Sequence, residues 1–331
     1  MVENRKIEDS EAEQRLDRWF KRHYPGLSHG RLEKLLRKGQ VRVDGRRAKA
    51  STRLESGQVV RVPPLGMDSQ STERPKRSAP EPSAREAADL KARILYQDDW
   101  VMAIDKPAGL AVQGGSGQHR HLDGFLDLLQ FEKSERPRLV HRLDRDTAGV
   151  LLLARTAEAA RRLAASFKRD EPLKLYWALV VGSPDPDKGE IDLPLAKSGT
   201  TGREKMETQG ADARSAVSRY ATIARSGKQV TWLALRPLTG RTHQLRAHCS
   251  AIGHPILGDG KYGGRQAFPD KPWKPESLML LAREITLPHP DDGTTLRVTA
   301  PLPSHFEAAF GKLGFQSETG YALKAADILG L

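Results

Sequence analysis

Residues 63–90 most strongly limit what this chain can fold into. The segment begins Pro63-Pro64-Leu65-Gly66 and is dominated by proline, serine and charged residues. A segment of this composition buries too little apolar surface to offset the entropy that a chain loses on folding. The sequence therefore predicts a flexible linker between a small domain, residues 1–62, and a larger one, residues 91–305. A C-terminal tail or helix is expected over residues 306–331.

The rest of the chain has the composition of a globular protein. Of its 331 residues, 38% are hydrophobic and 29% are charged, which argues against a disordered chain. The apolar run around Leu151 is too short to span a bilayer, and the charged N-terminus does not resemble a secretory signal. Cys249 is the single cysteine, so no intrachain disulfide can form. We expect a cytoplasmic protein that is not bound to a membrane.

The charge of the chain indicates a polyanionic partner. It has 54 Lys and Arg against 42 Asp and Glu, a formal net charge of +12, and its pI is near 9.8. Residues 28–62 alone carry ten basic and three acidic side chains. Composition does not distinguish nucleic acid from an anionic membrane surface, but the concentration of charge in one short stretch predicts a binding surface there.

The small domain reads as two helices followed by strands. A helix is predicted over residues 11–23, opened by a capping box from Ser10 to Glu13, and a second helix between Ser28 and Gly39. The second helix has leucines on one side and basic residues on the other. The remainder is predicted to be β-structure, comprising Val41–Val43, the hairpin turn Asp44-Gly45 and Val59–Val62.

Two motifs in this domain are similar to those of a known module. Arg15-Leu-Asp-Arg-Trp19, and the run from Ser28 to Gly45, resemble the S4 RNA-binding domain over about 50 residues. The resemblance implies an RNA-binding surface on the second helix and the turn that follows it, although a basic helix face can also be merely solvated. The residues expected to meet phosphates are Arg31, Lys34, Arg37, Arg42 and Arg46.

The larger domain reads as α+β. Short apolar runs typical of strands recur along it, and helical patterns at Thr156–Phe167 and Thr242–Ile252 interrupt them. This order predicts a mainly antiparallel mixed sheet flanked by helices. The expected strands are Ile94–Tyr96, Val101–Ile104, Gly149–Arg155, Lys174–Val181, Ala216–Ile223, Val230–Leu235 and Leu278–Leu281.

A polar loop leads directly into one of these strands. Leu139–Ala154 begins with charged residues, among them Asp144 and Asp146, and ends in an unbroken apolar run. Polar side chains next to a buried strand cost desolvation energy, so their presence favours a functional loop. The alternative is structural, with Asp144 and Asp146 capping turns and pairing with neighbouring arginines.

The loop contains a motif that is similar to one in a known enzyme family. His141-Arg-Leu-Asp-x-x-Thr-Ala-Gly149 resembles the central motif of the RluA family of RNA pseudouridine synthases. Leu110–Gly117 is most similar to the members of C type, which act on large-subunit (23S) ribosomal RNA. Further motifs of the family occur in order at Asp105–Gly109, Lys174–Val180, Arg236–His248, His254–Tyr262 and Ala300–Pro303.

The resemblance implies an activity and assigns residues to it. The enzyme would isomerise specific uridines of ribosomal RNA, with Asp144 attacking C1′ of the sugar or C6 of the base, two possibilities that remain open. It assigns Arg241 to hold Asp144 ionised and Tyr176 to stack on the uracil and help remove the C5 proton. Arg142 would fill the space left by the flipped nucleotide. The expected substrate-binding residues are Arg142, His141, Arg246 and Thr147.

Two other interpretations compete with this one. A metal site could be drawn from His243, His248, Cys249 and His254, but the two histidines of the predicted helix are five residues apart and point to different faces. We therefore expect neither a metal nor a cofactor. A non-catalytic RNA-binding or ribosome-assembly factor is the alternative from another class. In both cases the partner is large-subunit ribosomal RNA or its assembly precursor, and a monomer is expected.

Overall fold

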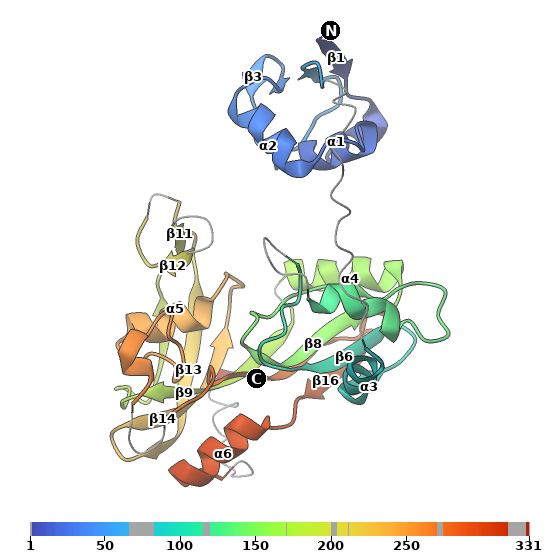
Figure 1. Cartoon of the computed structure of the whole chain (residues 1–331). Coiled ribbons are helices and arrows are strands. Elements are labelled where there is room, and N and C mark those ends of the chain that lie inside the picture. The colour runs from blue at the N-terminus through green and yellow to red at the C-terminus, as the bar shows by residue number, and fades with distance from the viewer. Residues whose placement is uncertain are drawn as a thin grey trace. The chain divides into compact units, whose positions relative to one another are not determined.

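The computed structural model forms two compact units, residues 1–77 and 78–331, which are drawn in Figure 1. In the part of the chain that the structure describes, no helix is long and apolar enough to cross a membrane. The described residues are 2–65, 83–114, 120–169, 171–199, 204–210, 212–269, 274–316 and 329–330.

The N-terminal unit packs two helices on a four-stranded sheet of order β1-β4-β2-β3. Leu16, Trp19 and Phe20 of the first helix and Leu32 and Leu36 of the second are buried in one core. The apolar residues of each helix therefore form one buried face, as their spacing in the sequence predicted. The elements are β1 (Glu3–Lys6), η1 (Asp9–Glu11), α1 (Leu16–His23), α2 (His29–Arg37), β2 (Arg42–Val43), β3 (Arg46–Arg47) and β4 (Val59–Val62).

The start of α1 differs from the prediction. The helix begins at Leu16, and the expected capping box from Ser10 to Glu13 is wrong. Glu13 has a left-handed φ of 64°, and its N–H donates to the carbonyl of Leu54 at 2.8 Å. This contact with a distant segment interrupts the helical pattern. A capping box does form two residues earlier, between Glu8, the N-cap of η1, and Glu11.

The second helix and the hairpin follow the prediction. The Ser28 hydroxyl accepts a hydrogen bond from the Arg31 N–H and caps α2. Asp44 and Gly45 have φ values of 49° and 74°, as a tight two-residue hairpin turn requires.

The predicted linker is only partly described. Its residues 66–82 lie outside the described part of the chain. Its C-terminal end forms helix α3 (Ala84–Ala92), so a flexible linker to residue 90 is wrong there. The Ser83 hydroxyl and the Glu86 side chain close a capping box, and Leu90 is buried against a hydrophobic cluster of the larger unit. The capping box and the burial of Leu90 stabilise this helix. The overall composition of residues 63–90 gave no sign of it.

The larger unit is built on a ten-stranded sheet of main order β10-β13-β14-β9-β15-β8-β6-β5, with β16 on β15 and β7 on β8. The strand pairs are antiparallel except for β15 and β8, which run parallel, so the predicted mainly antiparallel mixed sheet is confirmed. Its strands are β5 (Ile94–Gln97), β6 (Val101–Lys106), β7 (Arg138–Leu139), β8 (Ala148–Ala154), β9 (Leu173–Val181), β10 (Lys188–Asp192), β13 (Val217–Ser226), β14 (Val230–Pro237), β15 (Leu280–Pro288) and β16 (Thr295–Thr299).

Helices flank this sheet, and a small hairpin extends from it. Figure 1 shows α5 on one side of β9, β13 and β14 and α6 on the other. The remaining elements are η2 (Leu122–Leu129), α4 (Ala157–Lys168), β11 (Ala196–Ser198), β12 (Lys205–Glu207), α5 (Gln244–Ala251), η3 (Gly264–Ala267) and α6 (Ser304–Leu313).

Helix α6 belongs to the core of the larger unit. The Phe310 ring lies 4.6 Å from Trp232, which in turn packs edge-on against Trp177 at 4.7 Å. The predicted domain boundary at residue 305 therefore falls within α6, because the apolar face of this helix covers the sheet. The tail helix predicted beyond Ser317 lies outside the described residues except for Leu329 and Gly330, and Leu329 is buried.

Candidate active site

The polar loop between β7 and β8 is held by its flanking strands. All seven residues of β8 are buried, so the strand fixes the C-terminal end of the loop in the core. Gly149 has a φ of 111°, and a Cβ at this position would collide with the backbone carbonyl of Ala282 on β15. Within the loop, the Thr147 N–H donates to the Asp144 carbonyl at 3.2 Å. The turn that presents Asp144 is therefore closed by this hydrogen bond and anchored to β8 on its C-terminal side.

A buried lysine, Lys106, binds backbone carbonyls of this loop and of its neighbour. The Lys106 ammonium donates to the carbonyls of Pro107, Leu110 and Arg145, at 2.8 Å, 2.9 Å and 2.9 Å. Burial lowers the pKa of Lys106 to about 8, against the opposing charges of Asp146 and Asp144. The sequence placed Lys106 in a motif but gave it no role. Three carbonyls gathered around one ammonium cannot be read from the sequence, because Arg145 is 39 residues away.

The predicted site residues of this unit gather around one pocket. Its volume is about 320 Å³, which lies at the lower end of the range for ligand pockets, roughly 300–1,000 Å³. The lining includes every site residue predicted for the larger domain, namely Asp144, Tyr176, Arg241, Arg142, His141, Arg246 and Thr147. Lining residues that the sequence analysis missed include Lys174, Thr239, Thr242, His243 and Leu280.

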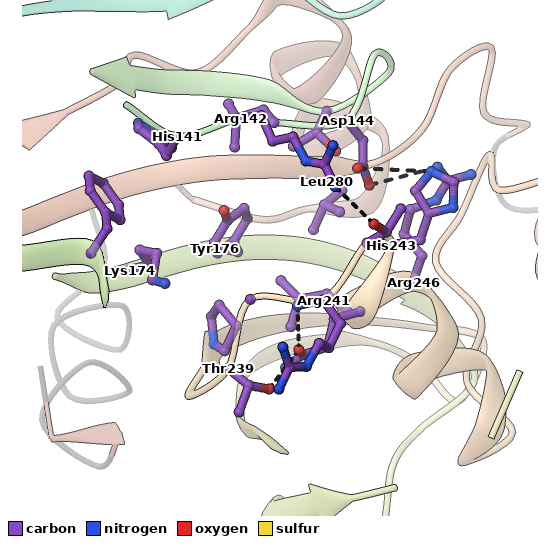
Figure 2. Close-up of a pocket in the computed structure, with 18 of the residues that line it drawn as sticks. His141, Arg142, Asp144, Lys174, Tyr176, Thr239, Arg241, His243, Arg246 and Leu280 are labelled. Carbon is purple, nitrogen blue, oxygen red and sulfur yellow. Dashed lines mark hydrogen bonds and ion pairs between the residues drawn. The ribbon is translucent and has the colours of Figure 1, made fainter. Parts of the chain in front are cut away.

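The Asp144 carboxylate lies between two groups of the α5 region, as Figure 2 shows. Arg246 Nη1 is 3.9 Å from Asp144 Oδ2, and His243 Nε2 is 3.9 Å from Asp144 Oδ1. The Asp144 side chain is 25% exposed, whereas that of Arg246 is only 8% exposed. The carboxylate is thus open to the pocket, while its cationic neighbour is enclosed in protein.

Arg246 is itself fixed by a second carboxylate. Its Nε and Nη2 atoms donate to the two oxygens of Asp259, each at 2.8 Å. Burial opposes the charge of Arg246, but the hydrogen bonds to Asp259 outweigh it and leave the pKa raised. The guanidinium is therefore a permanent cation in a fixed position beside Asp144.

The partner assigned to Asp144 by the family resemblance is wrong. The Arg241 Nε atom donates to the carbonyl of Ser215 at 3.0 Å. Among the described residues, the arginine within 4.0 Å of the Asp144 carboxylate is Arg246. Helix α5 begins only at Gln244, after a left-handed residue at His243. This starting point determines which face of the helix carries Arg246, and that face is the one toward Asp144. Asp259 occupies two of the nitrogens of Arg246, and the substrate-binding role expected of Arg246 stays a prediction.

Tyr176 lies on β9, between β14 and β15, and lines the pocket. Burial, and then the negative charge of Asp144, raise the pKa of its hydroxyl. The side chain therefore stays protonated at neutral pH. An aromatic ring in this position offers a flat surface for a planar ligand.

His141 and Arg142 are adjacent but have different surroundings. His141 Nε2 accepts the Leu152 N–H at 2.8 Å, and its ring stacks on Phe167 with centroids 4.9 Å apart. Burial, and then the charge of Lys174, lower the pKa of His141 to about 3, so its ring is neutral and supports β8. Arg142 is exposed and donates to the Thr242 hydroxyl at 3.1 Å, which joins the two loops on either side of the pocket.

The histidines once considered as metal ligands have other contacts. His248 bonds to the Ser218 hydroxyl and to the Leu193 carbonyl, each at 3.0 Å, and His254 bonds to the Val181 carbonyl at 2.9 Å. Within the described ranges, no three His, Cys, Asp or Glu side chains are grouped as metal ligands.

The basic residues of the N-terminal unit differ in how far they are already engaged. Arg42 donates to the carbonyls of Gly39 and Gly45, at 3.1 Å and 3.0 Å, and so braces the hairpin turn. Arg31 donates to the Leu65 carbonyl at 2.8 Å. None of the five predicted RNA-binding residues forms a salt bridge with a described carboxylate. Lys34, Arg37 and Arg46 are exposed.

Two family models match the chain, and together they define its class. The S4 domain model matches residues 14–60, and the model described as RNA pseudouridylate synthase matches residues 100–251. The match to the second model includes the Asp144 loop, β9 with Tyr176, and α5 with Arg246.

Curated relatives match nearly the whole chain. "Ribosomal large subunit pseudouridine synthase C" of Vibrio cholerae is 35% identical over 93% of this chain and 95% of the relative. The Escherichia coli K12 protein of the same name is 33% identical over the same shares. Among solved structures, human RNA pseudouridylate synthase domain containing 4 has a TM-score of 0.59 at 28% identity, over 70% of this chain and 97% of that one. The chain belongs to the RNA pseudouridylate synthase family, which confirms the prediction of an RNA pseudouridine synthase with an S4 domain.

Proposed function

We propose that this chain converts specific uridines of large-subunit ribosomal RNA into pseudouridine, with Asp144 as the catalytic residue. The observation that carries the proposal is the Asp144 carboxylate, open to a small pocket and flanked by the fixed cation of Arg246. The choice of RNA is supported by the Vibrio and Escherichia relatives, whose names specify the large ribosomal subunit. These relatives are named as synthases and offer no support for a non-catalytic assembly factor.

Uridine in a stacked helix cannot reach the pocket, so the nucleotide must be flipped out, at a cost of a few kcal/mol. The flipped uracil would stack on the ring of Tyr176, which lines the pocket. Arg142, exposed at the same pocket, would leave Thr242 and occupy the vacated space in the RNA.

The reaction then needs a carboxylate that stays ionised. In one route Asp144 forms a bond to C1′ as the N1–C1′ bond breaks; in the other it first adds to C6 of the base. The uracil rotates in the pocket, a C5–C1′ bond forms, and the carboxylate is released. The proton of C5 is lost and N1 gains one, so the isomerisation is redox-neutral. Arg246 supports these steps by stabilising the ionised carboxylate.

The proton at C5 does not pass to Tyr176 in its resting form. Its hydroxyl is kept protonated by burial and by Asp144, so it can accept a proton only after it has given up its own. We therefore assign Tyr176 to stacking and orientation, and the Asp144 carboxylate released in the last step to proton removal.

Basic side chains near the catalytic pocket could bind the phosphates of the RNA. A second pocket of about 640 Å³ shares His243 and Arg246 with the first and is also lined by Arg145 and Lys261. The exposed basic residues of the S4 domain supply a further surface for RNA. We propose that the enzyme acts as a monomer, which light scattering of the RNA complex would test.

The test is the release of tritium from large-subunit ribosomal RNA labelled at uridine C5. Wild-type enzyme should release it without any added cofactor, and Asp144→Asn should reduce release by at least about 1,000-fold. Asp146→Asn is the matched control, because Asp146 lies two residues away and pairs with the exposed Arg145. Comparable activity of Asp144→Asn and wild type would refute the proposed role of Asp144.

A further inference from the structure

The motif from His254 to Tyr262 supplies no reacting group to the steps above, yet two of its side chains reach the α5 region. Asp259 binds Arg246 through two hydrogen bonds. The Tyr262 hydroxyl lies 3.0 Å from His243 Nδ1, and the two rings pack edge to face with centroids 5.6 Å apart. Each of these side chains thus contacts one of the two groups that flank Asp144.

The hydrogen bonds of Tyr262 determine where its proton goes. The hydroxyl oxygen accepts the backbone N–H of Met206 on β12 at 3.0 Å. A hydroxyl has one proton to donate, and among the described residues the atom within hydrogen-bond distance that can accept it is His243 Nδ1, so we infer that Tyr262 is the donor in this pair. A neutral histidine that accepts at Nδ1 carries its own proton on Nε2, the nitrogen 3.9 Å from Asp144 Oδ1. Tyr262 therefore selects the tautomer that presents an N–H to the catalytic carboxylate.

The surroundings of His243 favour the neutral ring. Burial lowers its pKa, and the charges of Arg246 and Lys261 act in the same direction, while Asp144 and Asp259 oppose them. His243 also has a left-handed φ of 51°, which is uncommon for a residue other than glycine. The strain is held in place by the turn before α5 and by the contact with Tyr262.

We propose that His243 is a positioning residue that holds Oδ1 of Asp144, and that Tyr262 orients it for this task. The inference rests on the proposed catalytic role of Asp144. With Arg246 on one oxygen and His243 on the other, rotation of the carboxylate is restricted, and its attack direction is set before RNA binds. A neutral N–H does this without adding a second full charge, which would weaken the carboxylate as a nucleophile. Interactions of this kind are commonly long in the free enzyme and shorten in the substrate complex.

The experiment is a double-mutant cycle under single-turnover conditions, with the C5-tritiated RNA as substrate. Tyr262→Phe keeps the buried ring and removes only the hydroxyl, and it should lower the rate at saturating enzyme about 10-fold with little change in RNA affinity. His243→Ala should cost about 30-fold. His243→Gln, whose amide can place an N–H near the Nε2 position, should restore the rate to within about 3-fold of wild type. In the His243→Ala background, Tyr262→Phe should cost nothing further, because the hydroxyl acts through the imidazole.

Tyr220→Phe is the control for the loss of a buried tyrosine hydrogen bond. Its hydroxyl donates to the Pro186 carbonyl in a different part of the same unit, and the variant should keep the wild-type rate. Equal losses from Tyr262→Phe in both backgrounds, or no rescue by His243→Gln, would overturn the proposal and leave a structural role. If Asp144→Asn stays active, the proposed function fails. If Asp144→Asn is inactive and Tyr262→Phe matches wild type, only this inference fails.

Discussion

The two units of the chain hold their positive charges in opposite ways. In the larger unit, Arg246 is 8% exposed and bound to both oxygens of Asp259 before any substrate arrives. In the S4 unit, Lys34, Arg37 and Arg46 are exposed and form no salt bridge with a described carboxylate. The arginine beside the catalytic carboxylate is therefore fixed, whereas these three basic residues of the S4 unit have no carboxylate partner among the described residues.

The difference reflects what each unit must do with an anion. A catalytic carboxylate has to be held in one geometry, and a preorganised cation achieves this without reorganisation during the reaction. Binding to phosphates gains most of its free energy from the release of counterions, which depends on how many cations approach the RNA rather than on their exact placement. We therefore expect the pocket to be sensitive to geometry and the S4 surface to be sensitive to total charge.

The largest effect should come from changing geometry while keeping charge. Arg246→Lys retains one positive charge but cannot bind both oxygens of Asp259 and also face Asp144. We expect the single-turnover rate to fall about 100-fold. The same exchange in the S4 unit, Arg37→Lys, should leave both rate and RNA affinity within about 2-fold of wild type.

Arg241→Lys provides a second comparison within the pocket. Because Arg241 is bound to the Ser215 carbonyl and not to Asp144, its replacement should lower the rate far less than Arg246→Lys does. A larger loss from Arg241→Lys than from Arg246→Lys would restore the partner that the family resemblance assigned. Thermal unfolding of each variant would separate these effects from loss of the fold.

The next effect comes from removing charge on the S4 surface. Replacing Lys34, Arg37 and Arg46 together by glutamine should weaken RNA binding about 10- to 100-fold and reduce the slope of log K against log salt by up to about 3. The rate at saturating enzyme should not change, since none of the three lines the catalytic pocket. Filter binding at several salt concentrations measures the slope. A collapse of the saturated rate would instead make the S4 surface part of the catalytic site.

Local signals in the sequence were enough for much of this fold. The Asp44-Gly45 turn and the buried run of β8 were identified because short-range chemistry decides them. The strand β1 was missed, since Glu3–Lys6 is entirely polar and is a strand only through its pairing with β4. The break before α1 was missed for a similar reason, because Glu13 bonds to a residue 41 positions later. Contacts between distant segments decided both.

The site shows the same division. Every residue predicted for the pocket lines it, because ordered motifs carry the identity of the residues. The pairing among them was not predictable: Arg241 and Arg246 lie in one motif, and the left-handed residue at His243 decides which of them faces Asp144. The roles of Lys106, Asp259 and Tyr262 likewise depend on contacts that only the folded chain creates.

The smallest predicted effect concerns acid stability, in which the two units should differ. Among the described residues of the larger unit, four histidines have a pKa that burial lowers: His141, His243, His248 and His305. In the unfolded chain an imidazole binds a proton below about pH 6.5, whereas folded His141 does so only near pH 3. The unfolded state then binds more protons, so stability falls as pH falls through this window. For His141 this loss is about 1.4 kcal/mol at pH 5.5.

The S4 unit should keep its stability as the pH falls to 5.5. Its buried carboxylate, Glu11, has a lowered pKa because hydrogen bonds from the Glu8 N–H and from His23 outweigh burial, and the stability that it contributes is lost only below about pH 4.5. Hydrogen–deuterium exchange of the full chain at pH 7.0 and 5.5, corrected for intrinsic rates, should therefore show protection falling in β8 and not in β4. His141→Gln, whose amide oxygen can accept the Leu152 N–H in place of the imidazole, should reduce the fall in β8. An equal loss of protection in β4 would mean that the buried histidines do not distinguish the two units.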